Sequence, residues 1–330
     1  MMISRPPIPP AFLVFAMLTL VGLPAFAEDH PDADTRTSPS CVHEMRYESV
    51  AGLIVVSLTI ADSPPLEFVL DSGATQSSLT DPLLAAALGL RVKKTGLARG
   101  VGSAATWVLV TENVAVMSDG VEFLNAPLVI HDIGTRLEAT AGREIHGFLG
   151  ADVFERYVVE IDPVGSRILL HDPTTFHSQG AGHLVLLDVI DRRPVVQGTA
   201  AVKEHSKAVP VRLVVDTGSS RSLSLITKSA RHLKPPADQV EGASVGVSGE
   251  NKVFLASTRR LHIGPIVAEG VETAWFGKLG MPAIGNIPNL NGILGNRFLS
   301  RFRVVFDYHR GRLILSNPHA SSGAAHGFAD

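Results

Sequence analysis

Val69-Leu70-Asp71-Ser72-Gly73-Ala74-Thr75 is an apolar strand that ends in Asp, a hydroxyl residue and Gly, and the chain carries a second copy of it. The second copy is Val214-Val215-Asp216-Thr217-Gly218-Ser219-Ser220, which lies 145 residues further along. One Asp-Ser/Thr-Gly tripeptide indicates little, because these residues end many strands in turns for local steric and hydrogen-bonding reasons. The pair is informative because a second motif recurs at a fixed distance after each copy.

The spacing to this second motif is the same in both copies. Gly147-Phe148-Leu149-Gly150 begins 76 residues after Asp71, and Gly292-Ile293-Leu294-Gly295 begins 76 residues after Asp216. Three later positions agree at the same offset: Asp162 with Asp307, Arg167 with Arg312, and Pro173 with Pro318. With two copies and a long period, this pattern predicts a duplicated lobe and not a solenoid.

The N-terminal residues 1–27 differ in composition from the rest of the chain. Arg5 precedes an apolar run from Ala11 to Leu23, and Ala25-Phe26-Ala27 has the small residues of a cleavage site. This order is typical of a secretory signal peptide cut after Ala27, with an uncleaved anchor as the alternative. We therefore expect a periplasmic or secreted protein with no stable membrane span after cleavage.

Length, charge and cysteine content narrow the functional classes. The 330 residues, 45% of them apolar, are enough for two domains with apolar cores. Removing Arg5 with the signal peptide leaves 28 basic and 32 acidic residues, a net charge of −4, which argues against nucleic-acid binding. Cys41 is the single cysteine, so an intrachain disulfide is impossible. The 13 histidines are scattered and no metal or nucleotide motif is present, so we expect no metal and no cofactor.

Short β-branched and apolar runs, separated by Gly, Pro and Asp, predict a mostly β chain with short helices. The helices are expected over residues 82–88, 151–157, 226–233 and 296–301. The expected organisation is a flexible N-terminal arm (28–47), an N-terminal lobe (48–173), a linker (174–189), a C-terminal lobe (190–318) and a disordered tail (319–330).

A pseudo-two-fold axis between the repeats would bring Asp71 and Asp216 face to face. Two carboxyl groups within hydrogen-bonding distance share one proton and titrate as a unit. The ionised member can take a proton from a bound water, and the protonated member can donate to a carbonyl oxygen. This is general acid–base hydrolysis of an amide, without a covalent intermediate.

The residues beside each Asp fit this chemistry. Gly73 and Gly218 allow a tight loop that brings backbone N–H groups towards the carboxyl groups. The hydroxyls of Ser72 and Thr217 can hydrogen-bond across to the opposite loop and hold the pair together.

The two loops are chemically unequal. The Ser219 hydroxyl can donate to Asp216 and favour its ionisation, whereas Ala74 has no hydroxyl to do so for Asp71. Thr75 and Ser219 complete the residues that we expect to support the loops. The asymmetry predicts a mildly acidic pH optimum.

The sequence resembles the aspartic peptidases, with lobes of the short bacterial retropepsin-like type. The resemblance rests on the two Asp loops, on the two Gly-apolar-apolar-Gly segments, and on Arg297–Phe302 with Asp307 and Arg312-Leu313. It covers residues 48–173 and 190–318. It implies a mostly β fold of two pseudo-symmetric acid-protease lobes with short helices, a cleft between the lobes, and one catalytic Asp from each.

The resemblance also implies a flap over the cleft. The residues expected there are Gly100, Val101, Gly102, Trp107, Gly246 and Val247. Pepsins carry a tyrosine in the flap, but none of the three tyrosines here lies in these segments. Which lobe supplies the flap stays open, and Trp107 is either a flap residue or a core residue.

These features predict an aspartic endopeptidase that acts as a monomer on peptide or protein substrates. The alternative is a catalytically silent peptide-binding protein on the same fold, and a third possibility is a dimer that uses its lobes separately. Both Asp, both hydroxyl residues and both glycines are present, which favours the enzyme.

Overall fold

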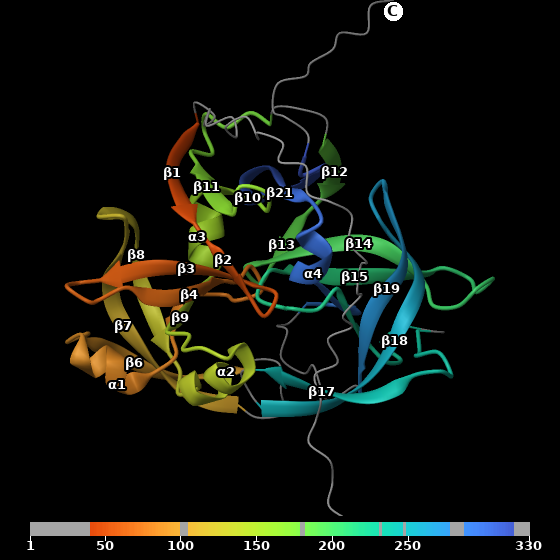
Figure 1. Ribbon diagram of the computed structural model, residues 1–330, viewed down its shortest axis with the longest axis horizontal. Coiled ribbons are helices and arrows are strands. Elements are labelled where there is room, and N and C mark those ends of the chain that lie inside the picture. Colours follow the sequence, from red (N-terminus) through yellow and green to blue (C-terminus); the bar gives the residue numbers. More distant parts are fainter. Residues whose placement is uncertain are drawn as a thin grey trace, which may run out of the picture. The chain divides into compact units, whose positions relative to one another are not determined.

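The computed structural model describes residues 40–99, 105–178, 182–230, 233–246, 249–277 and 287–319. These residues form two eight-stranded sheets and one six-stranded sheet (Figure 1). The expected signal peptide and most of the expected arm and tail lie outside the described residues. Among the residues described, no helix has both the length and the apolar character needed to span a bilayer.

The N-terminal lobe is built on the first eight-stranded sheet. Its strands, in spatial order, are β2 (Glu48–Val50), β3 (Leu53–Ile60), β4 (Leu66–Leu70), β9 (Gly147–Leu149), β5 (Ser78–Leu79), β8 (Val121–Ile130), β7 (Ala105–Ser118) and β6 (Val92–Arg99). Neighbouring strands are antiparallel except for β4 with β9 and β5 with β8, which are parallel. The parallel pair β4–β9 places the first Asp loop beside Gly150.

The C-terminal lobe repeats this sheet strand for strand. Its order is β13 (Asp188–Ile190), β14 (Arg193–Ala201), β15 (Val209–Asp216), β20 (Gly292–Gly295), β16 (Leu223–Ile226), β19 (Ile266–Phe276), β18 (Gly249–Ile263) and β17 (Val240–Gly246). The parallel pair β15–β20 has the register of β4–β9, shifted by the 145 residues of the repeat. The predicted fold class, mostly β with two pseudo-symmetric lobes, is confirmed.

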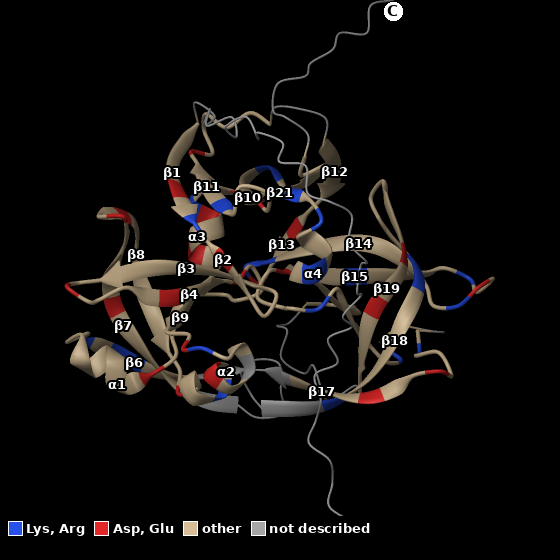
Figure 2. Ribbon diagram, in the orientation of Figure 1, with Lys and Arg blue, Asp and Glu red and all other residues tan. Residues whose placement is uncertain are grey.

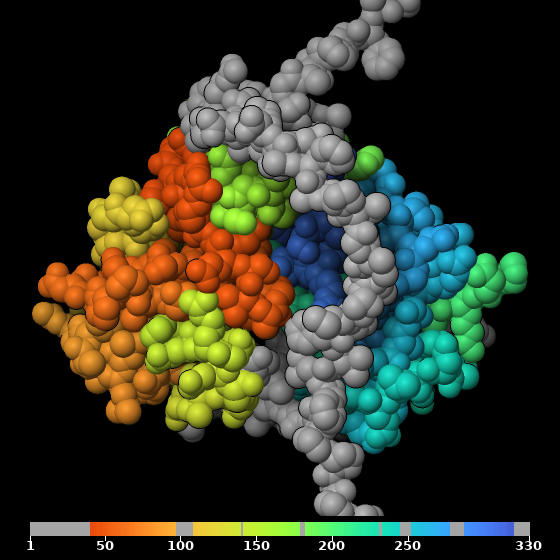
Figure 3. Space-filling view, viewed as in Figure 1, coloured from red at the N-terminus to blue at the C-terminus, as the bar shows by residue number. Residues whose placement is uncertain are grey.

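A six-stranded sheet joins the two lobes. Its order is β1 (Cys41–Arg46), β11 (Arg167–His171), β10 (Val158–Asp162), β21 (Arg303–Asp307), β22 (Arg312–Ser316) and β12 (Gly182–Leu186). The central pair β10–β21 is antiparallel and takes one strand from each lobe. In the space-filling view, the red-to-yellow N-terminal residues and the green-to-blue C-terminal residues gather on opposite sides (Figure 3).

Ion pairs lie across the junction in this sheet. Arg303 of β21 reaches Glu160 and Asp162 of β10, at 3.0 Å each. Asp162 also accepts from Arg167 at 2.9 Å, and Asp307 accepts from Arg312 at 2.5 Å. Figure 2 shows acidic and basic residues close together over β10, β11 and β21. Asp162 and Asp307 thus have structural ion pairs, as their position beside the two arginines suggests.

The strand before each Asp is buried on both faces, which fixes where it ends. Phe68 and Leu70 face the main core, and Val69 faces a second apolar cluster on the other side of the sheet. In the C-terminal lobe, Val215 likewise faces the main core, and Val214 faces a separate apolar cluster on the other side of the sheet. Burial of each such side chain contributes about 1.5–3 kcal/mol, so sliding either strand by one residue would be costly.

The helices are α1 (Pro82–Ala87), α2 (Gly134–Ala141), α3 (Ala151–Arg156), α4 (Asn296–Leu299) and the 3-10 helix η1 (Tyr308–Arg310). Asp81 caps α1 by accepting from the Leu83 N–H, as its position before Pro82 predicts. The helix expected over residues 226–233 is wrong in the part of this segment that the structure describes. β16 ends at Ile226, and Lys228 has a φ of 64°, which breaks the chain into turns.

Two of the expected segments need correction. The sequence predicts a flexible arm over residues 28–47, but residues 41–46 form β1, which is paired with β11. It predicts a linker over residues 174–189, but this segment contains β12, paired with β22, and the start of β13. Both errors have one cause: these strands complete a sheet whose other strands come from distant parts of the chain, so the local sequence carries little of the signal.

Candidate active site

The two Asp loops meet where the lobes join. Asp71 follows β4, and its N–H donates to the Leu149 carbonyl at 2.9 Å. Asp216 is the last residue of β15 and pairs in register with Gly295 of β20. Both aspartates are partly exposed and lie at equivalent points of the two sheets. The structure therefore brings together the two carboxyl groups that the sequence singled out.

Two buried hydroxyl groups bond the loops to each other. The Ser72 N–H donates to Thr217 Oγ1 at 3.0 Å, and the Thr217 N–H donates to Ser72 Oγ at 3.1 Å. Each hydroxyl in turn donates to a carbonyl of the opposite strand, Ser72 to Val215 at 2.8 Å and Thr217 to Leu70 at 2.7 Å. Both side chains are 0% exposed, so these four bonds are shielded from water. They fix the two loops at one relative position.

Each loop glycine packs directly against the opposite carboxyl group. A Cβ atom on Gly73 would lie 2.6 Å from Asp216 Cγ and 2.8 Å from both carboxyl oxygens. A Cβ atom on Gly218 would lie 2.6 Å from both Asp71 carboxyl oxygens. Real Cβ atoms do not approach this closely, so any other residue would push the carboxyl groups apart. Close approach, more than turn geometry, requires glycine here.

The two carboxyl groups share a proton. Burial raises the pKa of Asp216 well above its usual value, and the charge and hydrogen bond of Asp71 raise it further. Burial also raises the pKa of Asp71, but the hydrogen bond from Asp216 and those from two backbone N–H groups oppose the rise. The pair therefore titrates as a unit, and between its two titrations it holds one proton and one negative charge.

Backbone donors explain this asymmetry. Asp71 Oδ1 accepts from the N–H groups of Gly73 at 2.9 Å and Ala74 at 3.0 Å. Asp216 Oδ1 accepts from the Gly218 N–H alone at 2.9 Å, and in the described part of the chain the Ser219 hydroxyl makes no bond to Asp216. The expectation that Ser219 favours ionisation of Asp216 is thus not met. Thr75 lies half-buried two residues beyond Gly73.

The first hairpin of each lobe reaches across to the other lobe. The turn between β2 and β3 places the Gly52 carbonyl 2.8 Å from the Asn296 side-chain amide of α4. The turn between β13 and β14 places Arg192 against Glu155 of α3, and Arg193 Nε donates to the Gly73 carbonyl at 2.8 Å. Sequence reasoning missed Arg193, because nothing near it in the chain indicates contact with a loop 120 residues away.

The expected flap residues lie at equivalent hairpins. Gly100, Val101 and Gly102 lie outside the described residues, between β6 and β7, and Trp107 pairs with Leu97 in that hairpin. Gly246 ends β17, and Val247 lies outside the described residues, between β17 and β18. The sheet order gives the two hairpins the same place in the two lobes. The side chain of Trp107 is not among those that the structure describes.

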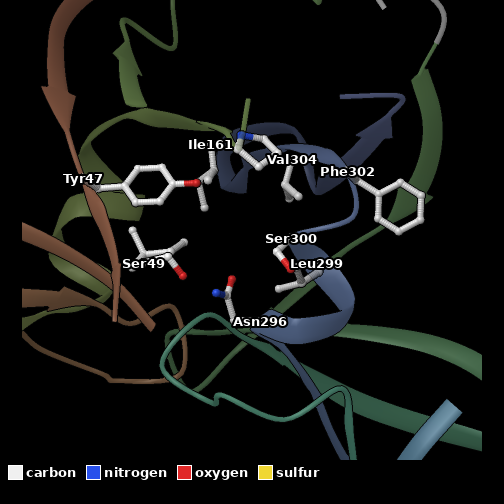
Figure 4. Close-up of a pocket in the computed structure, with 10 residues that line it drawn as sticks. Tyr47, Ser49, Ile161, Asn296, Leu299, Ser300, Phe302 and Val304 are labelled. Atoms are coloured by element: carbon white, nitrogen blue, oxygen red, sulfur yellow. The ribbon is translucent and has the colours of Figure 1, made fainter. Parts of the chain in front are cut away.

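Two pockets lie away from the carboxyl pair. One, of about 30 Å³, has room for roughly one water and lies between the start of the N-terminal lobe and α4 (Figure 4). The other, of about 330 Å³, lies in the N-terminal lobe and is lined by Pro82, Thr95, Val108, Leu109, Ile130 and Asp132. Neither is lined by Asp71 or Asp216. Among the described residues, no cluster of three or more His, Cys, Asp or Glu side chains is arranged to hold a metal ion.

Comparison with known proteins finds a match to the N-terminal lobe. Residues 56–153 match a family model described as an aspartyl protease. The matched region runs from β3 through the Asp71 loop to α3, and so includes both motifs of the first repeat. It supports an aspartyl protease family and an aspartic protease-like function in general. No curated protein matches the chain.

Proposed function

We propose that the protein is an aspartic endopeptidase, with two tandem lobes of the short bacterial retropepsin-like type, and that Asp71 and Asp216 form its catalytic pair. One observation carries the proposal: each carboxyl group packs directly against the glycine of the opposite loop, so the two carboxyl groups meet where the lobes join. A structural role for two like charges in such close contact would be costly, whereas a pair that holds one proton is suited to acid–base chemistry.

The number of backbone donors to each carboxyl group suggests the roles. Asp71, which accepts two backbone N–H groups, is the base that takes a proton from a water bound between the carboxyl groups. Asp216 is the acid that donates to the carbonyl oxygen of the scissile amide. The water oxygen attacks the carbonyl carbon, and the product of this step is a neutral gem-diol.

Collapse of the gem-diol completes the reaction. Asp71 gives its proton to the amide nitrogen, the carbon–nitrogen bond breaks, and a hydroxyl proton of the gem-diol returns to Asp216. The pair ends in its starting protonation state, and no bond forms between protein and substrate. This cycle requires no group beyond the two carboxyls and the water.

The substrate is proposed to be an extended peptide that crosses the pair between the hairpins β6–β7 and β17–β18. An extended strand can hydrogen-bond to strand edges on both sides, as peptides do in β-strand addition. We further propose that the protein acts as a monomer, since one chain supplies both aspartates, and that it acts in the periplasm or outside the cell, as the N-terminal sequence suggests.

The test is cleavage of a peptide library by the purified protein from about pH 3 to pH 8. Asp71→Asn and Asp216→Asn are each expected to abolish cleavage, because either change removes one of the two proton-transfer groups. Asp81→Asn is the matched control, because Asn caps a helix as well as Asp and the Asp81 carboxyl group bonds to the start of α1.

The outcomes separate the alternatives. Loss of cleavage in both variants and retention in the control would support a single shared pair, and the cut sites would define specificity. Activity that survives either substitution would contradict the mechanism. Folded parent protein that binds peptides without cutting them at any pH would replace the enzyme with a peptide-binding role.

A further inference from the structure

Arg193 of the C-terminal lobe reaches the Asp loop of the N-terminal lobe. It begins β14 in the C-terminal lobe, yet its Nε donates at 2.8 Å to the carbonyl of Gly73, in the N-terminal loop. Its Nη1 donates to Asp191 Oδ2 at 2.8 Å, on the same turn. The residue is only 9% exposed. A guanidinium held by a neutral carbonyl and one carboxylate keeps its positive charge close to the junction.

The groups around Arg193 do not cancel its positive charge, so this charge acts on the two aspartates. Asp191 pairs with it but has a half-exposed side chain, where water screens the pair. The carboxylate of Glu155, in α3, forms its ion pair with Arg192 at 2.6 Å. Tyr308 of η1 is neutral, because burial raises the pKa of its phenol well above the usual value. The charge of Arg193 accordingly lowers the pKa of both Asp71 and Asp216.

We propose that Arg193 is a positioning residue of the catalytic pair: it fixes the Gly73 carbonyl across the lobe junction and supplies the positive charge that keeps the pair singly ionised. The inference rests on the proposed function for its meaning, but the electrostatic effect itself needs no substrate. Gly73 packs against Asp216, so one side chain acts on both carboxyl groups. Without the charge, the pair would accept a second proton at a higher pH and lose its base.

The experiment monitors the two carboxyl groups by ¹³C NMR in protein labelled at the aspartate side chains, with Asp71→Asn and Asp216→Asn to assign the signals. Arg193→Gln is expected to move both titration midpoints to higher pH. Arg193→Lys keeps the charge and is expected to leave them near the parent values. Arg46→Gln, which removes an arginine of β1 whose side chain is 78% exposed, is the control and is expected to leave them unchanged.

Unmoved midpoints in Arg193→Gln, or an equal rise in Arg193→Lys, would overturn the proposal. Should Arg193→Gln fail to fold, Asp191→Asn tests the same electrostatic effect by removing the carboxylate that pairs with Arg193. This variant should fold, because Asn also tolerates the positive φ of this position. Removing the partner carboxylate should move both midpoints to lower pH, and no movement would contradict the proposal. Protein that shows these shifts but cleaves no peptide would disprove the endopeptidase and leave the role of Arg193 standing.

Discussion

The Thr217 N–H donates to the hydroxyl of Ser72 at 3.1 Å, while the Ser72 N–H donates to the hydroxyl of Thr217 at 3.0 Å. Each residue is therefore donor and acceptor for the other across the lobe junction. Because both are fully buried, a missing hydroxyl leaves polar backbone groups with no water to replace it. The relative position of the two Asp loops depends on this exchange.

The first prediction concerns stability. Ser72→Ala leaves the Thr217 N–H and the Val215 carbonyl without this partner, and should lower the free energy of unfolding by about 1–3 kcal/mol. Thr217→Ser keeps the hydroxyl and should change it much less. Urea unfolding measures both. Equal losses in the two variants would show that packing, and not the hydroxyl exchange, holds the loops.

The second prediction concerns the loop glycines. Gly73→Ala and Gly218→Ala each force a methyl group against the opposite carboxyl group, and should reduce kcat/KM by about 100-fold or more. Circular dichroism should show a retained β fold. Gly277→Ala is the control, because no heavy atom of the residues that the structure describes lies within 4 Å of the Cβ position. Full activity in either loop variant would mean that the close approach is not needed.

The sequence predicts most of this site because the repeat preserves it. The offset that matches the Asp loops also matches the parallel pairs β4–β9 and β15–β20. The equivalence extends to residues that look unrelated: His146 accepts from the Glu67 N–H at 2.9 Å, and Asn291 accepts from the equivalent Arg212 N–H at 2.8 Å. Different side chains accept the same backbone N–H group in the two lobes, so sequence identity between the repeats underestimates their structural symmetry.

Contact between distant segments is the part that the sequence does not predict. Arg193 and Gly73 belong to different lobes, and no periodicity or motif near either residue indicates that they meet. The pairing of β10 with β21 is hidden for the same reason, since each strand also forms a hairpin with its own neighbour. Local pattern finds the elements, but the docking of one lobe on the other depends on side chains that become neighbours only after folding.

The third prediction concerns the junction sheet. Arg303→Met removes the cation shared by Glu160 and Asp162, and should lower the free energy of unfolding by roughly 1–3 kcal/mol. The cost is smaller than for loss of a sole partner, because Asp162 still pairs with Arg167 and Glu160 with His171. Arg297→Met, which breaks an exposed pair with Glu272, should cost about 0–1 kcal/mol. Equal costs would contradict a structural role for the junction pairs.

The cost of Arg303→Met should also depend on pH. Burial pushes the pKa of Glu160 up, but the hydrogen bond and charge of His171 and the charge of Arg303 outweigh it and lower the pKa overall. A lowered folded-state pKa stabilises the fold above the pKa of the unfolded chain, and this stability is lost as the pH falls through the folded-state value. The difference between parent and variant should therefore shrink in acid.

The last prediction is that Asp216→Asn, which we expect to be inactive, is more stable than the parent at neutral pH. The folded protein holds the Asp216 proton to a higher pH than the unfolded chain does, since burial and Asp71 raise its pKa. As the pH rises above the usual aspartate range, the unfolded chain ionises first and the parent loses stability. Asn never ionises, so the variant should gain about 0.5–2 kcal/mol at pH 7, a common range for stabilising substitutions.

The same reasoning requires the gain to disappear in acid, because below the usual aspartate pKa the carboxyl group is protonated in both the folded and the unfolded chain. Urea unfolding of parent and variant at a series of pH values measures the difference, with Asp81→Asn as a control that keeps its helix cap. A variant less stable than the parent at neutral pH would mean that the ionised pair is a favourable part of the fold. In that case the carboxyl groups would have a structural role, and the case for a strained catalytic pair would fail.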